Sequence, residues 1–171
     1  MISRYLSLSV LTTSLLCATA QSASPLPANY IHVNAPMAQR LVRAVKAKHP
    51  EIKKLGLHAT PPNAADNAII GSDIASKIGK KSSEPDMKKV VAAKPSAERI
   101  DKEGIYDLFL PVRDAQGRDI GQGFVVMEVP FANASNAEEA LHIGEAIRNE
   151  VQQQIPVAQL CTNNREPLQR N

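Results

Sequence analysis

The feature of this chain that most constrains its fold is a hairpin pattern between residues 105 and 131. Apolar and polar side chains alternate over residues 105–113, as in a strand with one buried face. Residues 114–118 contain Gly117 where a tight turn needs a left-handed conformation, and residues 120–131 return as an apolar strand. Such a pair predicts an antiparallel sheet whose apolar face must be covered by other elements. The apolar face of the first strand is assigned to Tyr106, Leu108, Leu110 and Val112.

Three further stretches predict strands. Residues 52–59 alternate, with Leu55, Leu57 and Ala59 on one face and Lys54, Gly56 and His58 on the other. Residues 67–73 form the next expected strand, and residues 97–102 form a weaker one. Together with the hairpin they predict a five-stranded antiparallel sheet.

Three helices are predicted around these strands. The first is capped by Asn34 and ends at Pro50, with an apolar stripe of Met37, Leu41, Ala44 and Val45. A short helix follows Ser83, which forms a capping box with Asp86, and its apolar side is Met87, Val90 and Val91. The last is capped by Ser135 with Glu138 and ends near Pro156, with an apolar stripe of Ala140, Leu141, Gly144, Ile147, Val151 and Ile155. The fold class is therefore expected to be α+β.

The N-terminus has the order of a secretory signal peptide. Arg4 precedes an apolar run over residues 5–16, and the small residues that follow suit cleavage after Ala20, with Ala23 as the alternative. The run is shorter than the roughly 20 apolar residues of a membrane-spanning helix. We therefore expect residues 1–20 to be removed and the product to be periplasmic or secreted, with no membrane span after cleavage.

The rest of the chain is expected to form one domain. Residues 21–34, rich in Pro, Ala and Ser, indicate a flexible leader; residues 35–156 carry the predicted elements; residues 157–171 indicate a polar tail. Cys161 is the one cysteine after the signal peptide, so no internal disulfide can form and stability must come from burial.

Composition and motifs disfavour several function classes. A formal net charge of +3 is too small to argue for nucleic-acid binding, and the absence of Trp removes common stacking platforms. No glycine-rich phosphate loop or Gly-x-Ser-x-Gly elbow is present. No histidine pair has the spacing of zinc ligands; the histidines are His32, His49, His58 and His142. We therefore expect a protein that is not an enzyme and that holds no cofactor and no metal.

A basic cluster precedes the predicted short helix. It consists of Lys80, Lys81, Ser82 and Ser83. Free backbone amides at a helix N-terminus favour an anion, so a small carboxylate could be held there. A solvated polar loop ahead of a helix cap is the alternative, and the residues alone leave it open.

Three stretches together carry a family resemblance. They are residues 68–73 (Ala-Ile-Ile-Gly-Ser-Asp), residues 77–82 (Lys-Ile-Gly-Lys-Lys-Ser) and residues 106–121, where a strand ends in an Asp-Ala-Gln-Gly turn and resumes with Ile-Gly. Over residues 36–131 the chain resembles the bacterial extracytoplasmic PAS-like sensor domains of the Cache group. It departs from their usual pattern because the sequence shows no second apolar span and no cytoplasmic output module.

The resemblance implies an N-terminal helix packed on a five-stranded antiparallel sheet. It also implies a pocket between the sheet and the loop–helix segment that binds small metabolites such as amino acids, amines or carboxylates. By position, the pocket residues would be His58, Ser72, Lys80, Lys81, Tyr106 and Asp107.

Two functional hypotheses follow. The leading one is an exported, free-standing PAS-like domain that binds a small metabolite without transforming it and signals to a protein partner. The alternative is a structural or protein-interaction domain in the periplasm that has no ligand and docks its helix faces on a partner.

Overall fold

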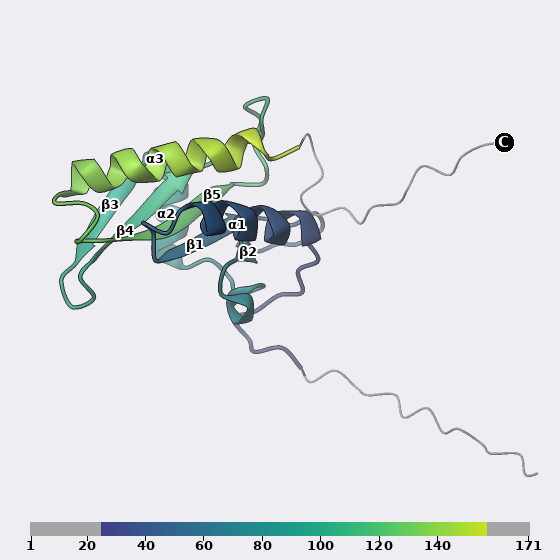
Figure 1. Cartoon of the computed structure of the whole chain (residues 1–171). Helices are drawn as coiled ribbons and strands as arrows, with labels where there is room; N and C mark the ends of the chain where they lie inside the picture. Colours follow the sequence, from purple (N-terminus) through teal and green to yellow (C-terminus); the bar gives the residue numbers. More distant parts are fainter. Residues whose placement is uncertain (1–24, 157–171) are drawn as a thin grey trace, which may run out of the picture.

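A computed structural model describes residues 25–156 of the chain, which form an α+β fold (Figure 1). The strands are β1 (Lys54–Ala59), β2 (Ala68–Ser72), β3 (Ser96–Ile100), β4 (Ile105–Pro111) and β5 (Phe124–Pro130). The helices are α1 (Pro36–Lys48), α2 (Glu84–Ala92) and α3 (Ala137–Gln153), with a 3-10 turn, η1 (Ala75–Lys77). The predicted signal peptide, its cleavage sites and the predicted polar tail with Cys161 lie outside the described residues.

The sheet is antiparallel throughout, in the order β2-β1-β5-β4-β3. The predicted hairpin lies in its interior: β4 pairs with β5 from Ile105 opposite Pro130 to Pro111 opposite Phe124. The turn glycine Gly117 has φ 77°, as its position required. The α+β class and the five-stranded antiparallel sheet predicted from the sequence are confirmed.

The second strand of the hairpin begins four residues later than predicted, at Phe124 rather than at residue 120. Gly121 and Gln122 both have positive φ values, 90° and 54°, which interrupt an extended strand. The Asp119 carboxylate accepts the Gln122 N–H at 2.9 Å and holds this turn. A side chain on Gly121 would collide with the Thr60 carbonyl oxygen at 2.6 Å, so this glycine serves close packing.

Helices α1 and α3 cover the same face of the sheet, which we call the inner face (Figure 1). Helix α1 lies on β1 and β2, and α3 lies on β3 and β4. Helix α3 packs very closely at Gly144, where an added Cβ would lie 2.4 Å from Leu108 Cδ1. The inner-face strand residues buried beneath the helices include Leu55, Leu57, Leu108, Leu110, Val125, Met127 and Val129.

Several details of the predicted helices were wrong by one residue or one face. The N-cap of α1 is Ala35 rather than Asn34, and its buried stripe is Ala38, Leu41, Val42 and Val45, which leaves Ala44 exposed. The N-cap of α3 is Asn136, whose side chain accepts the Glu139 N–H at 2.9 Å, whereas Ser135 donates to the Glu139 carboxylate. In α1 the contact with the sheet, and not the helix pattern alone, sets which face is buried.

Helix α2 begins as predicted with a capping box between Ser83 and Asp86. It lies on the opposite, outer side of the sheet against β4 and has no fully buried residue. Val91, predicted on its apolar side, is 85% exposed. Within residues 25–156, no helix is long and apolar enough to cross a membrane.

A charged cluster around His49 joins α1 to α3. His49 Nδ1 lies 2.7 Å from Glu51 Oε1, and Nε2 lies 2.8 Å from Glu150 Oε2 on α3. Both ring nitrogens therefore face carboxylate oxygens, an arrangement that suits the doubly protonated imidazolium. Partial burial alone would lower the pKa of His49, but the hydrogen bonds to Glu150 and Glu51 raise the pKa above its ordinary value of 6.5.

This cluster predicts a pH-dependent stability. Because the folded-state pKa of His49 is raised, its stabilisation is complete below pH 6.5 and is lost as the pH rises through that raised pKa. We expect His49→Gln to lower the free energy of unfolding at pH 5.5 by about 0.5–1 kcal/mol, since water screens the cluster, and by less at pH 8.5. Urea unfolding at both pH values measures this, with exposed His142→Gln as the matched control. An equal loss at both pH values would contradict the prediction.

Candidate functional site

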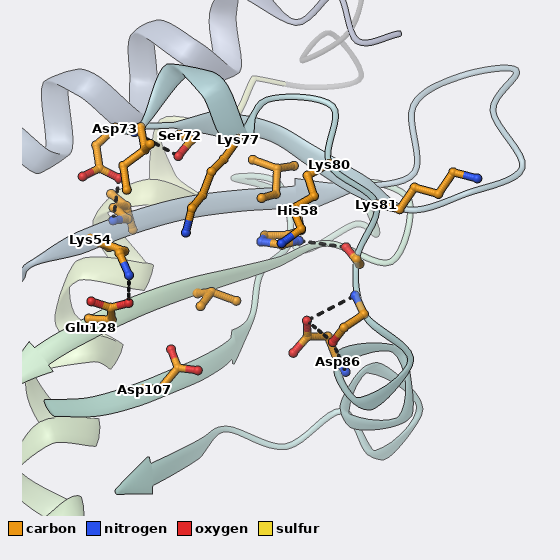
Figure 2. Close-up of a pocket in the computed structure, with 17 residues that line it drawn as sticks. Lys54, His58, Ser72, Asp73, Lys77, Lys80, Lys81, Asp86, Asp107 and Glu128 are labelled. Carbon is orange, nitrogen blue, oxygen red and sulfur yellow. Dashed lines mark hydrogen bonds and ion pairs between the residues drawn. The ribbon is translucent and has the colours of Figure 1, made fainter. Parts of the chain in front are cut away.

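A cavity of about 320 Å³ lies on the outer face of the sheet, beneath the segment that carries η1 and leads into α2 (Figure 2). Strand alternation supplies its floor: Lys54, Gly56 and His58 of β1 point outward, as predicted, and Val126 and Glu128 of β5 join them. The remaining lining residues are Leu55, Ile69, Ser72, Asp73, Ile74, Lys77, Lys80, Lys81, Ser82, Ser83, Asp86 and Asp107.

The register of the sheet aligns charged side chains along this floor. Lys54 of β1 is opposite Glu128 of β5, and Glu128 is opposite Asp107 of β4. Lys54 and Glu128 form an ion pair, and the Lys53 ammonium lies 3.7 Å from the second oxygen of Glu128. The Glu128 side chain is therefore compensated although it is almost completely buried.

Backbone hydrogen bonds hold the roof of the cavity to β2. The Ile69 N–H donates to the Lys80 carbonyl at 2.9 Å, and the Gly79 N–H donates to the Ile69 carbonyl at 2.8 Å. Gly79 has φ 85°, and an added Cβ would lie 2.4 Å from the Ile31 carbonyl oxygen. Residues 29–31, within the predicted leader, are bonded to residues 79–81 on the other side. The lysines of this segment are thus fixed in position at their backbones.

Four lysines reach the cavity, and two of them have charged partners. Lys54 pairs with Glu128, and Lys81 pairs with Asp66 at 2.8 Å. Lys77 and Lys80 form no ion pair and no side-chain hydrogen bond with any residue from 25 to 156. Figure 2 shows Lys77 extending from the roof toward the interior. Two uncompensated ammonium groups beside a cavity are suited to an anion.

The acidic residues of the cavity differ in their partners. Asp73 accepts the Leu55 N–H at 3.0 Å, and Asp86 belongs to the capping box of α2. Asp107 has no hydrogen bond or ion pair with the part of the chain that the structure describes. Burial, together with the negative charge of Glu128, raises the pKa of Asp107 from 3.8 to about 6. Its carboxyl group therefore titrates near neutral pH.

His58 lies at the other end of the floor, close to the roof (Figure 2). It is 6% exposed, and its ring stacks on Phe124 with centroids 4.3 Å apart. Its Nδ1 lies 2.8 Å from Ser82 Oγ, which itself donates to Asn67 Oδ1 at 2.6 Å. Burial lowers the pKa of His58 from 6.5 to about 4, so the imidazole is neutral at physiological pH.

Five of the six residues assigned to a pocket from the sequence line this cavity: His58, Ser72, Lys80, Lys81 and Asp107. The Ser72 hydroxyl accepts the Ile74 N–H, which gives it a role in the turn after β2. Tyr106 does not line the cavity. Its side chain is on the inner face, where the hydroxyl accepts from Arg99 at 2.9 Å and donates to the Ser135 carbonyl. Because adjacent strand residues point to opposite faces, Tyr106 and Asp107 cannot both face one pocket.

The lining residues of chemical interest that the sequence reasoning missed include Lys54, Gly56, Lys77 and Glu128. Lys54 and Gly56 share the outward phase of His58, so the alternation of residues 52–59 contained the signal that would have found them. Lys77 carried no such signal, because only the 3-10 turn brings it over the sheet. Among residues 25–156, no group of three or more His, Cys, Asp or Glu side chains is placed to hold a metal ion.

In comparisons with known proteins, no family model and no curated sequence matches the chain. The resemblance to PAS-like domains of the Cache group therefore stays a prediction, and the function rests on the cavity itself.

The raised pKa of Asp107 predicts that its carboxylate lowers the free energy of unfolding at alkaline pH. A folded-state pKa raised to about 6 means that the folded protein favours the neutral carboxyl; this stabilisation is complete below pH 3.8 and is lost as the pH rises through about 6. We expect Asp107→Asn to raise the free energy of unfolding at pH 8 by about 1–2 kcal/mol, after allowing for solvent screening, and the gain to vanish by pH 4.

Thermal unfolding at the two pH values measures this difference. The matched control is Asp101→Asn, which removes an exposed carboxylate that pairs with Arg99 outside the cavity, and which should not stabilise the protein. The prediction is contradicted if Asp107→Asn is no more stable than the unmodified protein at pH 8.

Proposed function

We propose that this protein is an exported, free-standing, PAS-like domain that binds a small carboxylate metabolite in the outer-face cavity without transforming it. The observation that carries the proposal is the pair of lysines, Lys77 and Lys80, which reach the cavity without a charged partner among residues 25–156. The positive charges of the two lysines make this part of the cavity attractive to an anion. A carboxylate between them would make charge-assisted hydrogen bonds to both.

The size of the cavity and the firm support of its walls suit a small ligand. A volume of about 320 Å³ lies at the lower end of the range for small-molecule sites. The floor is a rigid interior part of the sheet, and the roof is tied to β2 through Ile69, Gly79 and Lys80. Such a site can bind a metabolite with little reorganisation, which lowers the cost of binding.

The hydrogen bonds of Ser82 support ligand binding rather than nucleophilic catalysis. Nucleophilic catalysis by a side chain needs a nucleophile with an adjacent base that can take its proton. Ser82 is next to His58, but its hydroxyl donates to Asn67, so its proton is not available to the imidazole. The export and the sensing role rest on the signal-peptide pattern and on the resemblance to Cache domains.

Ligand titration of the full-length protein tests the proposal. Isothermal titration calorimetry with acetate, propionate, lactate, pyruvate and succinate, each against chloride at equal ionic strength, should show saturable binding of at least one carboxylate. The Lys77→Ala/Lys80→Ala variant should lose at least tenfold in affinity, since each charge-assisted hydrogen bond contributes about 1.5–3 kcal/mol.

The matched control is Lys94→Ala/Lys102→Ala, which removes the same charge at two exposed positions that do not line the cavity. It should bind as the unmodified protein does. No binding by any carboxylate, together with co-purification of one protein partner, would instead support the periplasmic interaction domain without a ligand.

A further inference from the structure

We infer that His58 Nε2 accepts a hydrogen bond from the bound ligand, so that the ligand is a hydroxycarboxylate rather than a plain carboxylate. The inference rests on the proposed function, because Lys77 and Lys80 are taken to hold the carboxylate. It adds a specificity-determining residue and a chemical group that this residue recognises.

The first step is the orientation of Asn67. Its Nδ2 lies 3.0 Å from the Gln122 carbonyl oxygen and 3.4 Å from that of Gly121. Two carbonyl acceptors can be matched only by the NH₂ group, so the amide oxygen must point the other way, toward Ser82. Asn67 is buried, and reversing the amide would leave carbonyl oxygens facing its own oxygen.

The second step is the direction of the bond between Ser82 and His58. Asn67 Oδ1 can only accept, so the Ser82 hydroxyl donates its one hydrogen to it over 2.6 Å. Ser82 Oγ then has only lone pairs to offer to His58 Nδ1 at 2.8 Å. Nδ1 must therefore carry the hydrogen of the neutral imidazole, and the lone pair must be on Nε2.

The third step is the surroundings of Nε2. Stacking on Phe124 fixes the plane of the ring, and Figure 2 shows the nitrogen that is not bonded to Ser82 facing the interior of the cavity. Nε2 has no hydrogen-bond partner within residues 25–156. It faces Gly56, where the absence of a side chain leaves room: an added Cβ would lie 3.5 Å from Nε2. A ligand donor can enter this room and pair with the Nε2 lone pair, which opens into the cavity.

The fourth step concerns the kind of donor. Asp86 and Lys77 are the charged groups that act on His58, Asp86 raising its pKa and Lys77 lowering it. Asp86 is already hydrogen-bonded to Ser83, whereas Asp107 lies farther along the floor (Figure 2). A hydroxyl can donate to Nε2 without a charged partner, whereas an ammonium would add a second positive charge beside Lys77. A hydroxyl next to the carboxylate of a small acid fits these conditions.

Two measurements on the full-length protein test the inference. Two-bond ¹H–¹⁵N NMR spectra of the ligand-free protein at pH 7 should show His58 protonated on Nδ1 and not on Nε2; the reverse tautomer would overturn the inference. Calorimetry with lactate, propionate and alanine, which differ in one substituent next to the carboxylate, should show lactate binding at least tenfold more tightly than propionate. Tighter binding of alanine than of lactate would show that the site prefers an ammonium to a hydroxyl at this position, and it would overturn the inference.

Gly56→Ala provides the matched variant. Its methyl group would make only ordinary contacts, the nearest being 3.5 Å to Nε2, so the fold and melting temperature should be retained. Because the methyl group covers Nε2, lactate affinity should fall to the level of propionate, while propionate affinity should change less than threefold. Retention of the preference for lactate in Gly56→Ala would overturn the role of His58.

Failure of this inference is distinguishable from failure of the proposed function. If propionate and lactate bind equally and both depend on Lys77 and Lys80, the proposed carboxylate site is supported and the inferred role of His58 is refuted. If neither acid binds, the proposed function and the inference fall together.

Discussion

The strict alternation of β1, β5 and β4 at the centre of the sheet is the constraint on which the rest of the structure depends. Because successive residues point to opposite faces, the same strands supply an apolar inner face and a polar outer one. Leu55, Leu57 and Met127 of the inner face are almost fully buried under α1 and α3. Burial of this face fixes the register, since a slip by one residue would turn the whole apolar set toward the cavity.

The fixed register also fixes the charges of the outer face. Lys54, Glu128 and Asp107 stand in one row because three neighbouring strands pair at those residues. Their spacing is then set by the sheet and not by the side chains. One consequence is that Glu128, with lysines on one side, is compensated, whereas Asp107 on the other side has the Glu128 carboxylate as its neighbour and a raised pKa.

The sequence predicted what depends on local periodicity and not what depends on neighbouring elements. The alternation of residues 105–113, the turn at Gly117 and the capping box of Ser83 with Asp86 are all encoded within a few residues, and all are present. The buried face of α1 was misplaced because Ala38 and Val42 are selected by close contact with Gly71 of β2, which no pattern in the helix reveals.

The same distinction applies to the candidate site. His58 and Asp107 could be placed by their outward phase, and Tyr106 could have been excluded because it shares a face with Leu108 and Leu110. Lys77 was not predictable, since a short 3-10 turn and the backbone pairing of residues 79–81 bring it over the sheet.

The two clusters of ionisable groups, at His49 and at the cavity, differ in how far their charges are matched. At His49 the charges are matched between α1 and α3 and stabilise the fold.

At the cavity, by contrast, several groups are held without partners: Lys77 and Lys80 without an anion within the described residues, Asp107 beside another carboxylate, and His58 with an open acceptor. The raised pKa of Asp107 indicates that its charged form is unfavourable there. On the proposed function, a small acid with a hydroxyl group would pair with the lysines and donate to the imidazole at the same time. This convergence at one place on a rigid sheet is the physical reason to regard the cavity as a binding site rather than as a gap in packing.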